Sequence, residues 1–393
     1  MNKTENKLVP ELRFPEFVND GEWKEDKFEN LISTVTPPKK LSSSNYLPQG
    51  KFPIIDQSQN YYCGRTDDKN SIIFDGLPLI IFGDHTCIFK VATEPFAQGA
   101  DGIKIIKTKS IINSIFLYQY LQYNSVRQEE YKRHFSILKN KIVHFPNNKT
   151  NEQQKIADCL SSLDEVITAH NDKLETLKNH KKGLLQNLFP QEGETVPKYR
   201  FPEFKNDGNW KEKKLGKVFS SFSGGTPSTS EKDYYGGKIP FIRSAEINKK
   251  NTELFLTELG LKNSSAKLVN KGDLLIALYG ANSGDAGISQ IDGAINQAIL
   301  CLKSDYSNNF VYQVLSLKKD WIINKYLQGG QGNLSGDIIK SIELYFPEKL
   351  EQQKIADCLS EVDNLITAQA DKIEQLKAHK KGLMQRLFPQ LKA

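Results

Sequence analysis

Two segments of the chain carry apolar residues at alternating steps of four and three. In residues 151–191 and again in 350–390 these positions form a heptad seam, which a polar residue interrupts at the same two places in each copy. This spacing predicts a long amphipathic helix with a narrow apolar stripe. The seam positions are Ile156, Leu160, Leu163, Ile167, His170, Leu174, Leu177, Lys181, Leu184 and Leu188, and then Ile355, Leu359, Val362, Ile366, Gln369, Ile373, Leu376, Lys380, Leu383 and Leu387. A proline, Pro190 or Pro389, ends each predicted helix.

A narrow apolar seam on so long a helix predicts a partner helix. We therefore expect the two helices to pair with each other as an antiparallel coiled coil, which would relate the two halves of the chain by a pseudo-two-fold axis. The sequence leaves parallel pairing open, and a second alternative is that each helix packs only on its own globular block.

The chain is duplicated. Residues 9–25 and 196–212 match at 13 of 17 positions, and residues 151–191 and 350–390 match at 29 of 41. The blocks between these repeats, roughly 26–150 and 213–349 (the first and second block), show little similarity by eye. The predicted domains are therefore 1–150, a helix at 151–191, 192–349, and a second helix at 350–393.

The two blocks read as mixed α/β, so the fold class is α+β with two long helices. Short β-rich runs are separated by glycine-rich turns, and each block then has one helix-like stretch. The predicted strands are 52–56, 71–74, 77–82 and 103–107, and 239–243, 273–279 and 298–303; the predicted helices are 115–123 and 310–326.

Composition changes this picture little. The net charge of +6 is weak evidence for a nucleic-acid partner, but the excess lies in the two blocks, where phosphates could be contacted. No apolar run approaches the roughly 18 residues of a membrane span. Five cysteines without a C-x-x-C pair argue against a disulfide framework, so we expect a cytoplasmic protein with no membrane partner.

Motifs for catalysis are missing from the sequence. The one Pro-Pro pair, at residues 37–38, lacks the flanking residues of an adenine methyltransferase, and no Walker A pattern occurs. His85 and Cys87 have no second cluster to complete a zinc site. We therefore expect a binding protein with no catalytic residues, no metal and no cofactor of its own.

At this point the layout resembles the specificity subunits of type I restriction-modification enzymes. The resemblance rests on the doubled EQQKIADCL helix with its proline stop, and on phrases at residues 50–64, 79–86, 222–247 and 271–284. It covers essentially the whole chain. It implies that the two blocks are target-recognition domains, each of which reads one half of a split, asymmetric site in double-stranded DNA.

The resemblance also implies partners. Two adenine-methyltransferase (M) subunits would dock on the helices, and ATP-dependent restriction (R) subunits would join them. S-adenosylmethionine, ATP and Mg are then expected in those subunits and not in this chain.

Polar loops after the predicted strands are the candidate DNA contacts. Gln and Asn can pair with adenine, Arg can pair with guanine, and glycines let the backbone approach the duplex; ordinary turns are the alternative. The candidates for base reading are Gln57, Ser58, Gln59, Asn60, Tyr61, Asp84, His85, Thr86, Thr226, Ser228, Arg243, Ser244, Tyr279, Asn282, Ser283, Gln331 and Asn333. The candidates for phosphate contact are Lys39, Lys40, Arg65, Lys249 and Lys250, with solvated surface lysines as the alternative.

Identical residues on the two helices are the candidate docking surface for the M subunits. Matching outward positions would suit two copies of one partner, whereas a recent duplication is the competing explanation. These residues are Gln153, Gln154, Lys155, His180 and Lys182, with Gln352, Gln353, Lys354, His379 and Lys381 as their counterparts.

Two other functions stay open at this stage. The chain could be a coiled-coil scaffold whose blocks bind protein, or a methyltransferase or nuclease with an unrecognised motif. Sequence-specific, salt-dependent DNA binding would argue against the scaffold, and activity of the purified chain would support an enzyme.

Overall fold

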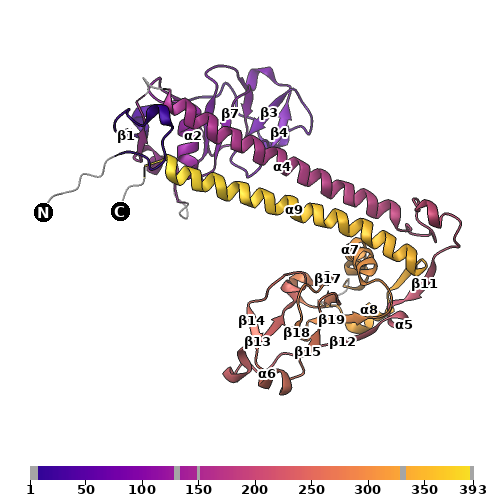
Figure 1. The fold of residues 1–393 in the computed structure, drawn as a ribbon. Coiled ribbons are helices and arrows are strands. Elements are labelled where there is room, and N and C mark those ends of the chain that lie inside the picture. Colours follow the sequence, from indigo (N-terminus) through magenta and orange to yellow (C-terminus); the bar gives the residue numbers. More distant parts are fainter. Residues whose placement is uncertain (1–7, 128–132, 148–150, 328–332, 390–393) are drawn as a thin grey trace. The chain divides into compact units, whose positions relative to one another are not determined.

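A computed structural model describes residues 8–127, 133–147, 151–327 and 333–389 of the chain. These residues form two compact units, Met1–Asp172 with Asp371–Ala393, and Lys173–Ala370. Each unit contains one block and a part of each long helix, α4 (Glu152–Leu188) and α9 (Lys349–Leu387) (Figure 1).

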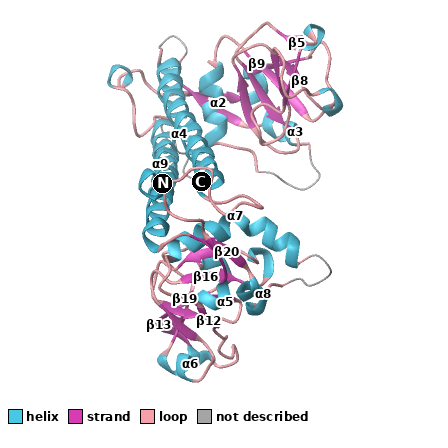
Figure 2. Ribbon diagram, turned by 90° about the vertical axis from the view of Figure 1, so that its right-hand side faces the viewer, coloured by secondary structure: helices cyan, strands magenta, loops and turns pink. Residues whose placement is uncertain are grey.

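The first block consists of two four-stranded sheets and a two-stranded sheet. The strand orders are β2-β9-β6-β7, β4-β3-β8-β5 and β1-β10. The strands are β1 (Lys24–Lys27), β2 (Ile32–Val35), β3 (Phe52–Ile55), β4 (Gly64–Thr66), β5 (Ile72–Ile73), β6 (Leu79–Gly83), β7 (Phe89–Ala92), β8 (Phe96–Gln98), β9 (Ile103–Thr108) and β10 (Ile142–Phe145), and the helices are α1 (Phe28–Leu31), α2 (Ser114–Tyr123) and α3 (His134–Lys139). The strands lie together, with α2 beside them (Figure 2).

The second block repeats this topology strand for strand. Its sheets run β12-β19-β16-β17, β14-β13-β18-β15 and β11-β20. The strands are β11 (Lys211–Lys214), β12 (Ser220–Ser223), β13 (Tyr235–Ile242), β14 (Leu254–Leu256), β15 (Lys267–Val269), β16 (Leu274–Ala277), β17 (Ala286–Ile288), β18 (Gly293–Ile295), β19 (Ile299–Lys303) and β20 (Glu343–Phe346), and the helices are α5 (Leu215–Val218), α6 (Glu258–Lys262), α7 (Asn308–Tyr326) and α8 (Gly336–Ser341). The two blocks are thus one fold with different sequences.

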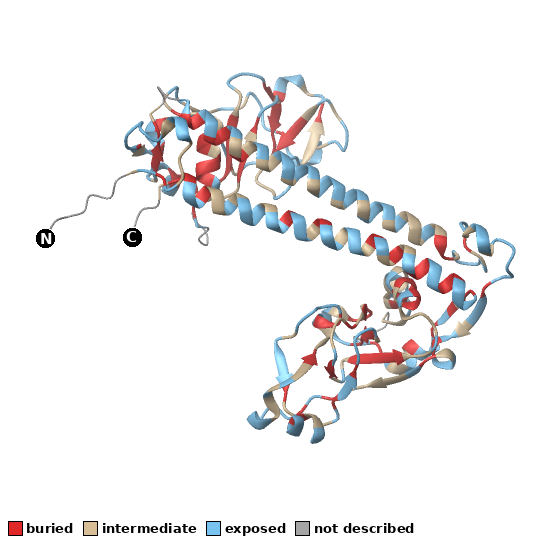
Figure 3. Ribbon diagram, in the orientation of Figure 1, coloured by how far each residue is buried: buried red, intermediate tan, exposed pale blue. Residues whose placement is uncertain are grey.

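Alternation along the central strands explains why the blocks fold. In β6, Ile80 and Phe82 join the core beneath α2, while Leu79 and Ile81 join the core between the two sheets. The strand β16 divides its residues between two cores in the same way. Burying each of these side chains stabilises the fold by roughly 1.5–3 kcal/mol. Buried residues are concentrated in the blocks, whereas the long helices are exposed along much of their length (Figure 3).

The two long helices pack together in antiparallel fashion, which confirms the prediction from the seam. In the first unit Lys380 of α9 donates a hydrogen bond to Asp164 of α4 at 2.5 Å, and in the second unit Lys181 donates to Asp363 at 2.9 Å. The seam residues of both helices are buried or half-buried. The two lysines that interrupt the seam are therefore the residues that form ion pairs across it.

Each ion pair also receives a buried glutamine from the neighbouring block. Gln119 of α2 donates to Asp164 at 2.7 Å, and Gln313 of α7 donates to Asp363 at 2.8 Å. Both glutamines are 1% exposed. The same three-residue network therefore occurs once in each unit.

Each block packs against both long helices. The alternative that each helix packs only on its own block is therefore wrong. In the first unit Ile156 and Leu160 of α4 share a core with Met384 and Leu387 of α9. This core also contains residues of α2. The ends of two helices that are far apart in the sequence thus meet beneath one block.

The shorter repeat, residues 9–25 and 196–212, fastens these helix ends. Arg13 makes two hydrogen bonds to Glu152 at the start of α4, at 2.8 and 2.6 Å, and Arg200 does the same to Glu351 of α9. Both glutamates are 1% exposed. The first copy also reaches the end of α9, because the Leu12 N–H donates to the carbonyl of Arg386 at 2.8 Å. The short repeat and the long-helix repeat therefore form one joint together, and this joint occurs once in each unit.

In the described part of the chain, none of the helices has the length and apolar character that crossing a membrane requires.

Candidate nucleic-acid interface

Strand register gathers the candidate loops of the first block at one edge. The ends of β3 and β8 lie side by side because these strands are parallel, and Gly83 at the end of β6 pairs with Ile103 at the start of β9. The loops that follow β3, β6 and β8 therefore meet. Their contacts include Thr86 Oγ1, which donates to the carbonyl of Gln57 at 3.0 Å, and the Asp84 N–H, which donates to the carbonyl of Gly102 at 2.7 Å.

A buried lysine on β7 holds the loop after β3. Lys90 is 4% exposed, and its Nζ donates to the carbonyls of Asp56 and Asn60 at 2.8 and 2.6 Å. The Tyr61 hydroxyl donates to the carbonyl of Val91 on the same strand. Burial lowers the pKa of Lys90, and the Asp56 carboxylate opposes that shift. The loop is thus fixed at both ends before any ligand arrives.

The close approach of the loop after β8 requires glycine. Gly102 has a φ of +96°, and a Cβ there would lie 2.6 Å from the Gln57 amide nitrogen. Gln57 Nε2 donates to the carbonyl of Asp101 at 3.4 Å. The sequence reasoning missed this third loop, although its Gly-Ala-Asp-Gly turn between two apolar runs marked a candidate.

The residues predicted to read bases in the first block lie at this edge, and all of them except Asp84 are exposed or half-buried. Asp84 is 6% exposed, and its carboxylate accepts a hydrogen bond from the N–H of Phe135 in α3 at 2.8 Å. Exposed or half-buried members of the edge are Gln57, Ser58, Gln59, Asn60, Tyr61, His85 and Thr86.

The predicted phosphate contacts of the first block are partly engaged within the chain. Lys39 and Lys40 are exposed and pair with Asp68 and Asp101 at 2.8 and 2.6 Å. Exposed pairs of this kind contribute about 0–1 kcal/mol, so phosphates could displace the carboxylates. Arg65 is half-buried on β4 and donates to the carbonyl of Gly50 at 3.1 Å.

The second block gathers its loops at the corresponding edge. The Gly224 N–H donates to the carbonyl of Asn296, and Thr226 Oγ1 donates to Gln297 at 2.6 Å. The Leu334 N–H donates to the carbonyl of Leu278 at 2.9 Å, which brings Leu334, the residue after the predicted Asn333, to this edge. Asn296 and Gln297 were missed, although their polar pair follows an apolar strand.

The predicted residues of the second block divide in a similar way. Ser283 is buried, with 6% of its surface exposed, and its hydroxyl donates to the carbonyl of Leu278 at 2.9 Å. Gln331 lies outside the described residues. The exposed or half-buried members are Thr226, Ser228, Arg243, Ser244, Lys249, Lys250, Tyr279, Asn282 and Asn333.

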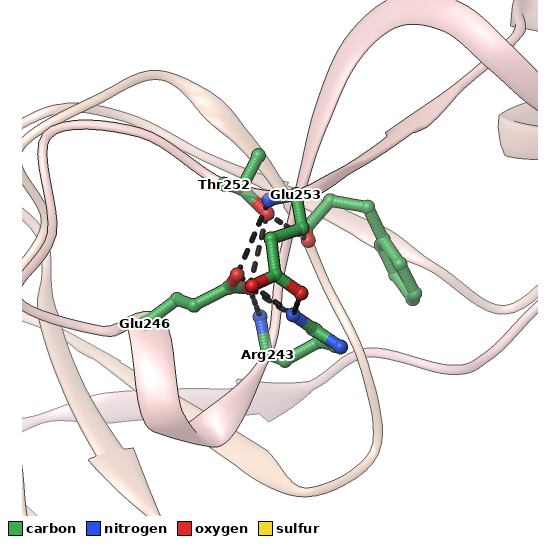
Figure 4. A network of polar contacts seen from close by, with 5 residues as sticks. Arg243, Glu246, Thr252 and Glu253 are labelled. Atoms are coloured by element: carbon green, nitrogen blue, oxygen red, sulfur yellow. Dashed lines mark hydrogen bonds and ion pairs between the residues drawn. The ribbon is translucent and has the colours of Figure 1, made fainter. Parts of the chain in front are cut away.

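Arg243 follows β13 and forms a charged network with two glutamates (Figure 4). Its guanidinium contacts Glu246 through Nε and Nη2, and Glu253 through Nη2. Burial alone would raise the pKa of Glu246, but hydrogen bonds from Arg243, Glu253 and Thr252 hold it at about 2. Arg243 also lines a hollow of about 320 Å³, together with Thr226 and Asn296.

The candidate docking residues on the helices are only partly outward. Gln153 and Gln352 are 4% and 1% exposed, so the prediction that they face outward is wrong. Gln153 accepts from the Asn113 N–H at 2.7 Å, and Gln352 accepts from the Ser307 N–H at 3.4 Å; Asn113 and Ser307 cap α2 and α7. These glutamines match because each one attaches its helix to a block. At this end of each helix the buried face is wider than the heptad seam.

The other eight candidate docking residues are exposed. They are Gln154, Lys155, His180, Lys182, Gln353, Lys354, His379 and Lys381. Lys155 and Lys354 make equivalent ion pairs with Glu16 and Glu203, at 3.3 and 3.5 Å. Within the residues that the structure describes, no group of three or more His, Cys, Asp or Glu side chains is placed to hold a metal ion.

Known proteins match both halves of the chain. The family model described as the type I restriction modification DNA specificity domain matches residues 21–179 and again 207–378. The putative type I restriction enzyme MjaX specificity subunit of Methanocaldococcus jannaschii is 28% identical over 285 residues, which cover 69% of this chain and 64% of that protein. The chain thus matches less than two thirds of that relative.

Two further comparisons extend over more of the chain. The EcoR124I/EcoR124II specificity subunit of Escherichia coli is 21% identical over 355 residues, 84% of each chain. The crystal structure of a type I restriction-modification system S subunit from M. genitalium has a TM-score of 0.69 at 18% identity, and covers 98% of this chain and 100% of that one. At that identity the structural likeness concerns the fold.

Proposed function

Because the chain belongs to the family of type I restriction modification DNA specificity domains, we propose that it is the DNA-specificity subunit of a type I restriction-modification enzyme. The observation that carries this proposal is the repeated strand order, which presents chemically different loops at the same edge of each block. Two unlike edges on one duplicated frame suit a split, asymmetric site in double-stranded DNA.

We assign the reading of the two half-sites to residues 1–150 and 192–349, and the spacing between them to residues 151–191 and 350–393. In the first block the amides of Gln57 and Gln59 are the candidate base contacts. In the second block Arg243 and Asn282 take that role. Replacing one residue that reads a base with alanine costs about 1–3 kcal/mol of specific binding.

The chain is a non-catalytic subunit in this proposal. Two M subunits would supply adenine methylation with S-adenosylmethionine, and R subunits would supply cleavage with ATP and Mg. The eight exposed matching residues of α4 and α9 support two equivalent docking sites. Native mass spectrometry of the reconstituted modification complex tests this, because one M subunit per chain, or none, would contradict it.

Mapping methylated adenines across the genome tests the function directly. Cells with the chain and its M partner should carry methylation at one bipartite, asymmetric sequence, and cells without the chain should lack it. Exchanging the edge loops of the first block for those of a relative should change one half-site and leave the other unchanged. Identical methylation patterns with and without the chain would refute the proposal.

Salt dependence tests the alternative of a protein-binding scaffold. Neutralising Lys39, Lys40, Arg65, Lys249 and Lys250 together should weaken binding to specific and random duplexes alike. Each true phosphate contact that is lost should flatten the slope of log K against log salt by about one. An unchanged slope in this variant would exclude these five residues as a phosphate-binding group.

A further inference from the structure

Arg243 and its counterpart in the first block carry opposite charges. Arg243 directly follows β13, and the matching strand register places Asp56 at the equivalent position after β3. Nε and Nη2 donate to Glu246 at 3.2 and 2.9 Å, and Nη2 also donates to Glu253 at 2.5 Å. Among the described residues no hydrogen bond involves Nη1. Glu246 therefore holds the guanidinium through Nε and Nη2, and Glu253 adds one further hydrogen bond at Nη2.

The two glutamates hold Arg243 in different ways. Glu246 is 4% exposed and accepts five hydrogen bonds, three from Arg243 itself, one from Thr252 Oγ1 and one from the Glu253 N–H. The Glu253 side chain is 77% exposed. In the part of the chain that the structure describes, its carboxylate contacts Arg243 alone.

The difference in burial decides which glutamate can be displaced from Arg243. An exposed ion pair contributes about 0–1 kcal/mol, whereas releasing a buried, fully hydrogen-bonded carboxylate leaves several donors unsatisfied. DNA phosphates that approach this edge also repel Glu253. Glu253 is thus readily displaced, while Glu246 stays.

The surroundings of Arg243 suit an acceptor from outside. Arg243 borders the 320 Å³ hollow, which Thr226 and Asn296 line from two other loops of the same edge. The end of a guanidinium offers two parallel N–H groups, and the major-groove edge of guanine offers two matching acceptors, O6 and N7.

We propose that Glu253 occupies, in the free protein, the place that a guanine edge takes when DNA binds, and that Glu246 is the positioning residue that orients Arg243 for this exchange. The proposal rests on the proposed function. A sequence without guanine at this position cannot replace the carboxylate, so Glu253 then stays on Arg243 and the exchange takes place only at a site with guanine.

Glu253→Gln tests the competing role, with Glu258→Gln as the control. Glu258 is also exposed and lies in the same block, so both variants lose one negative charge. In the modification complex Glu253→Gln should bind the specific duplex more tightly than Glu258→Gln does, by roughly five-fold, because Arg243 no longer has to release a carboxylate; its affinity for random duplex should match that of Glu258→Gln. A specificity ratio equal to that of Glu258→Gln would overturn the proposal.

Modified duplexes identify the group that Arg243 reads. Replacing guanine by 7-deazaguanine, position by position, removes N7 and should weaken wild-type binding at one position of the half-site read by the second block, by roughly ten-fold. Binding by Arg243→Ala should not change on that replacement, and it should respond to every other replacement as the wild type does. Equal weakening of all duplexes by Arg243→Ala would assign the residue to a phosphate, and a half-site without any G·C pair would likewise overturn the assignment to guanine.

Glu246→Gln separates orientation from folding. It keeps the shape of the side chain, and the thermal midpoint reports whether the block remains folded. The variant should lose most of the 7-deazaguanine effect while its affinity for random duplex stays within about two-fold of wild type. If the wild-type complex itself binds no specific sequence, the proposed function fails; if it does and these variants leave its preference unchanged, only the present inference fails.

Discussion

The two blocks share a frame and differ at its edge. Their strand orders are the same throughout, and in both the central strand divides its side chains between two cores. At the edge, the first block holds its loop with a buried cation, Lys90, which bonds to backbone carbonyls. The second block uses a buried anion, Glu246, which bonds to an arginine side chain. The cores require only apolar residues of suitable shape. Because the edge loops lie outside these cores, their polar and charged residues can differ between the blocks without changing the fold.

The blocks also differ in their helices. The helix that packs beneath the central sheet has 10 residues in α2 and 19 in α7. Nevertheless Gln119 and Gln313 reach equivalent aspartates from these two helices. The glutamine–aspartate contact with the long helices is thus the same in both blocks, although α2 and α7 differ in length.

The largest effect is expected from breaking the joint that both halves share. Arg13→Met or Arg200→Met leaves a buried glutamate without its cation, which should destabilise the affected unit by about 3–5 kcal/mol. Urea unfolding measures the loss, with Lys155→Met as an exposed control. Similar losses at the two sites would support equivalent joints, whereas a loss at only one site would show that the two halves are not energetically alike.

A smaller and more selective effect is expected at Lys90. Lys90→Met should release the loop after β3 and weaken discrimination in the first half-site by about 1–3 kcal/mol, with no change in the second. Lys69→Met, at an exposed position of the same block, controls for the lost charge. Methylation frequencies at genomic sites with one altered base provide the measurement. Equal relaxation of both half-sites would mean that Lys90 serves the fold and not the reading loop.

The ion pairs between the helices should contribute less, since their carboxylates are partly exposed. Lys380→Asp or Asp164→Lys should each destabilise the first unit, and the double exchange should recover about 1–2 kcal/mol. The same cycle at Lys181 and Asp363 tests the second unit. Absence of coupling in both cycles would leave the apolar seam alone to fix the pairing.

The smallest effect is a pH dependence in the second block. The folded pKa of Glu246 is about 2, below its ordinary value of 4.5, so its stabilisation is full above pH 4.5 and is lost as the pH falls toward 2. Between pH 7 and pH 4 the loss should be less than about 1 kcal/mol. Thermal melting of wild type and Glu246→Gln should therefore converge as the pH falls below 4.5. A difference that grows on acidification would contradict the assigned shift.

The sequence alone determined the frame to a considerable extent. The heptad seam gave α4 and α9, and continuous apolar runs gave β3, β6, β9, β16 and β19 with small errors at their ends. These elements are long or fully buried, so their periodicity is strong. Short strands such as β4 and β8, with three residues each, were missed because so few residues carry no period.

Only the tertiary structure decided what the polar residues do. Asp84, Ser283 and Gln153 looked like surface residues in the sequence, yet each is buried because a distant or neighbouring backbone group needs its hydrogen bond. The loops after β8 and β18 joined the edge only through strand register. The contacts of Lys181 with Asp363 and of Lys380 with Asp164 likewise show the antiparallel direction, which the seam alone left open. Hydrophobic pattern is a local property that the sequence displays directly, whereas the partner of a polar group is set by residues far along the chain.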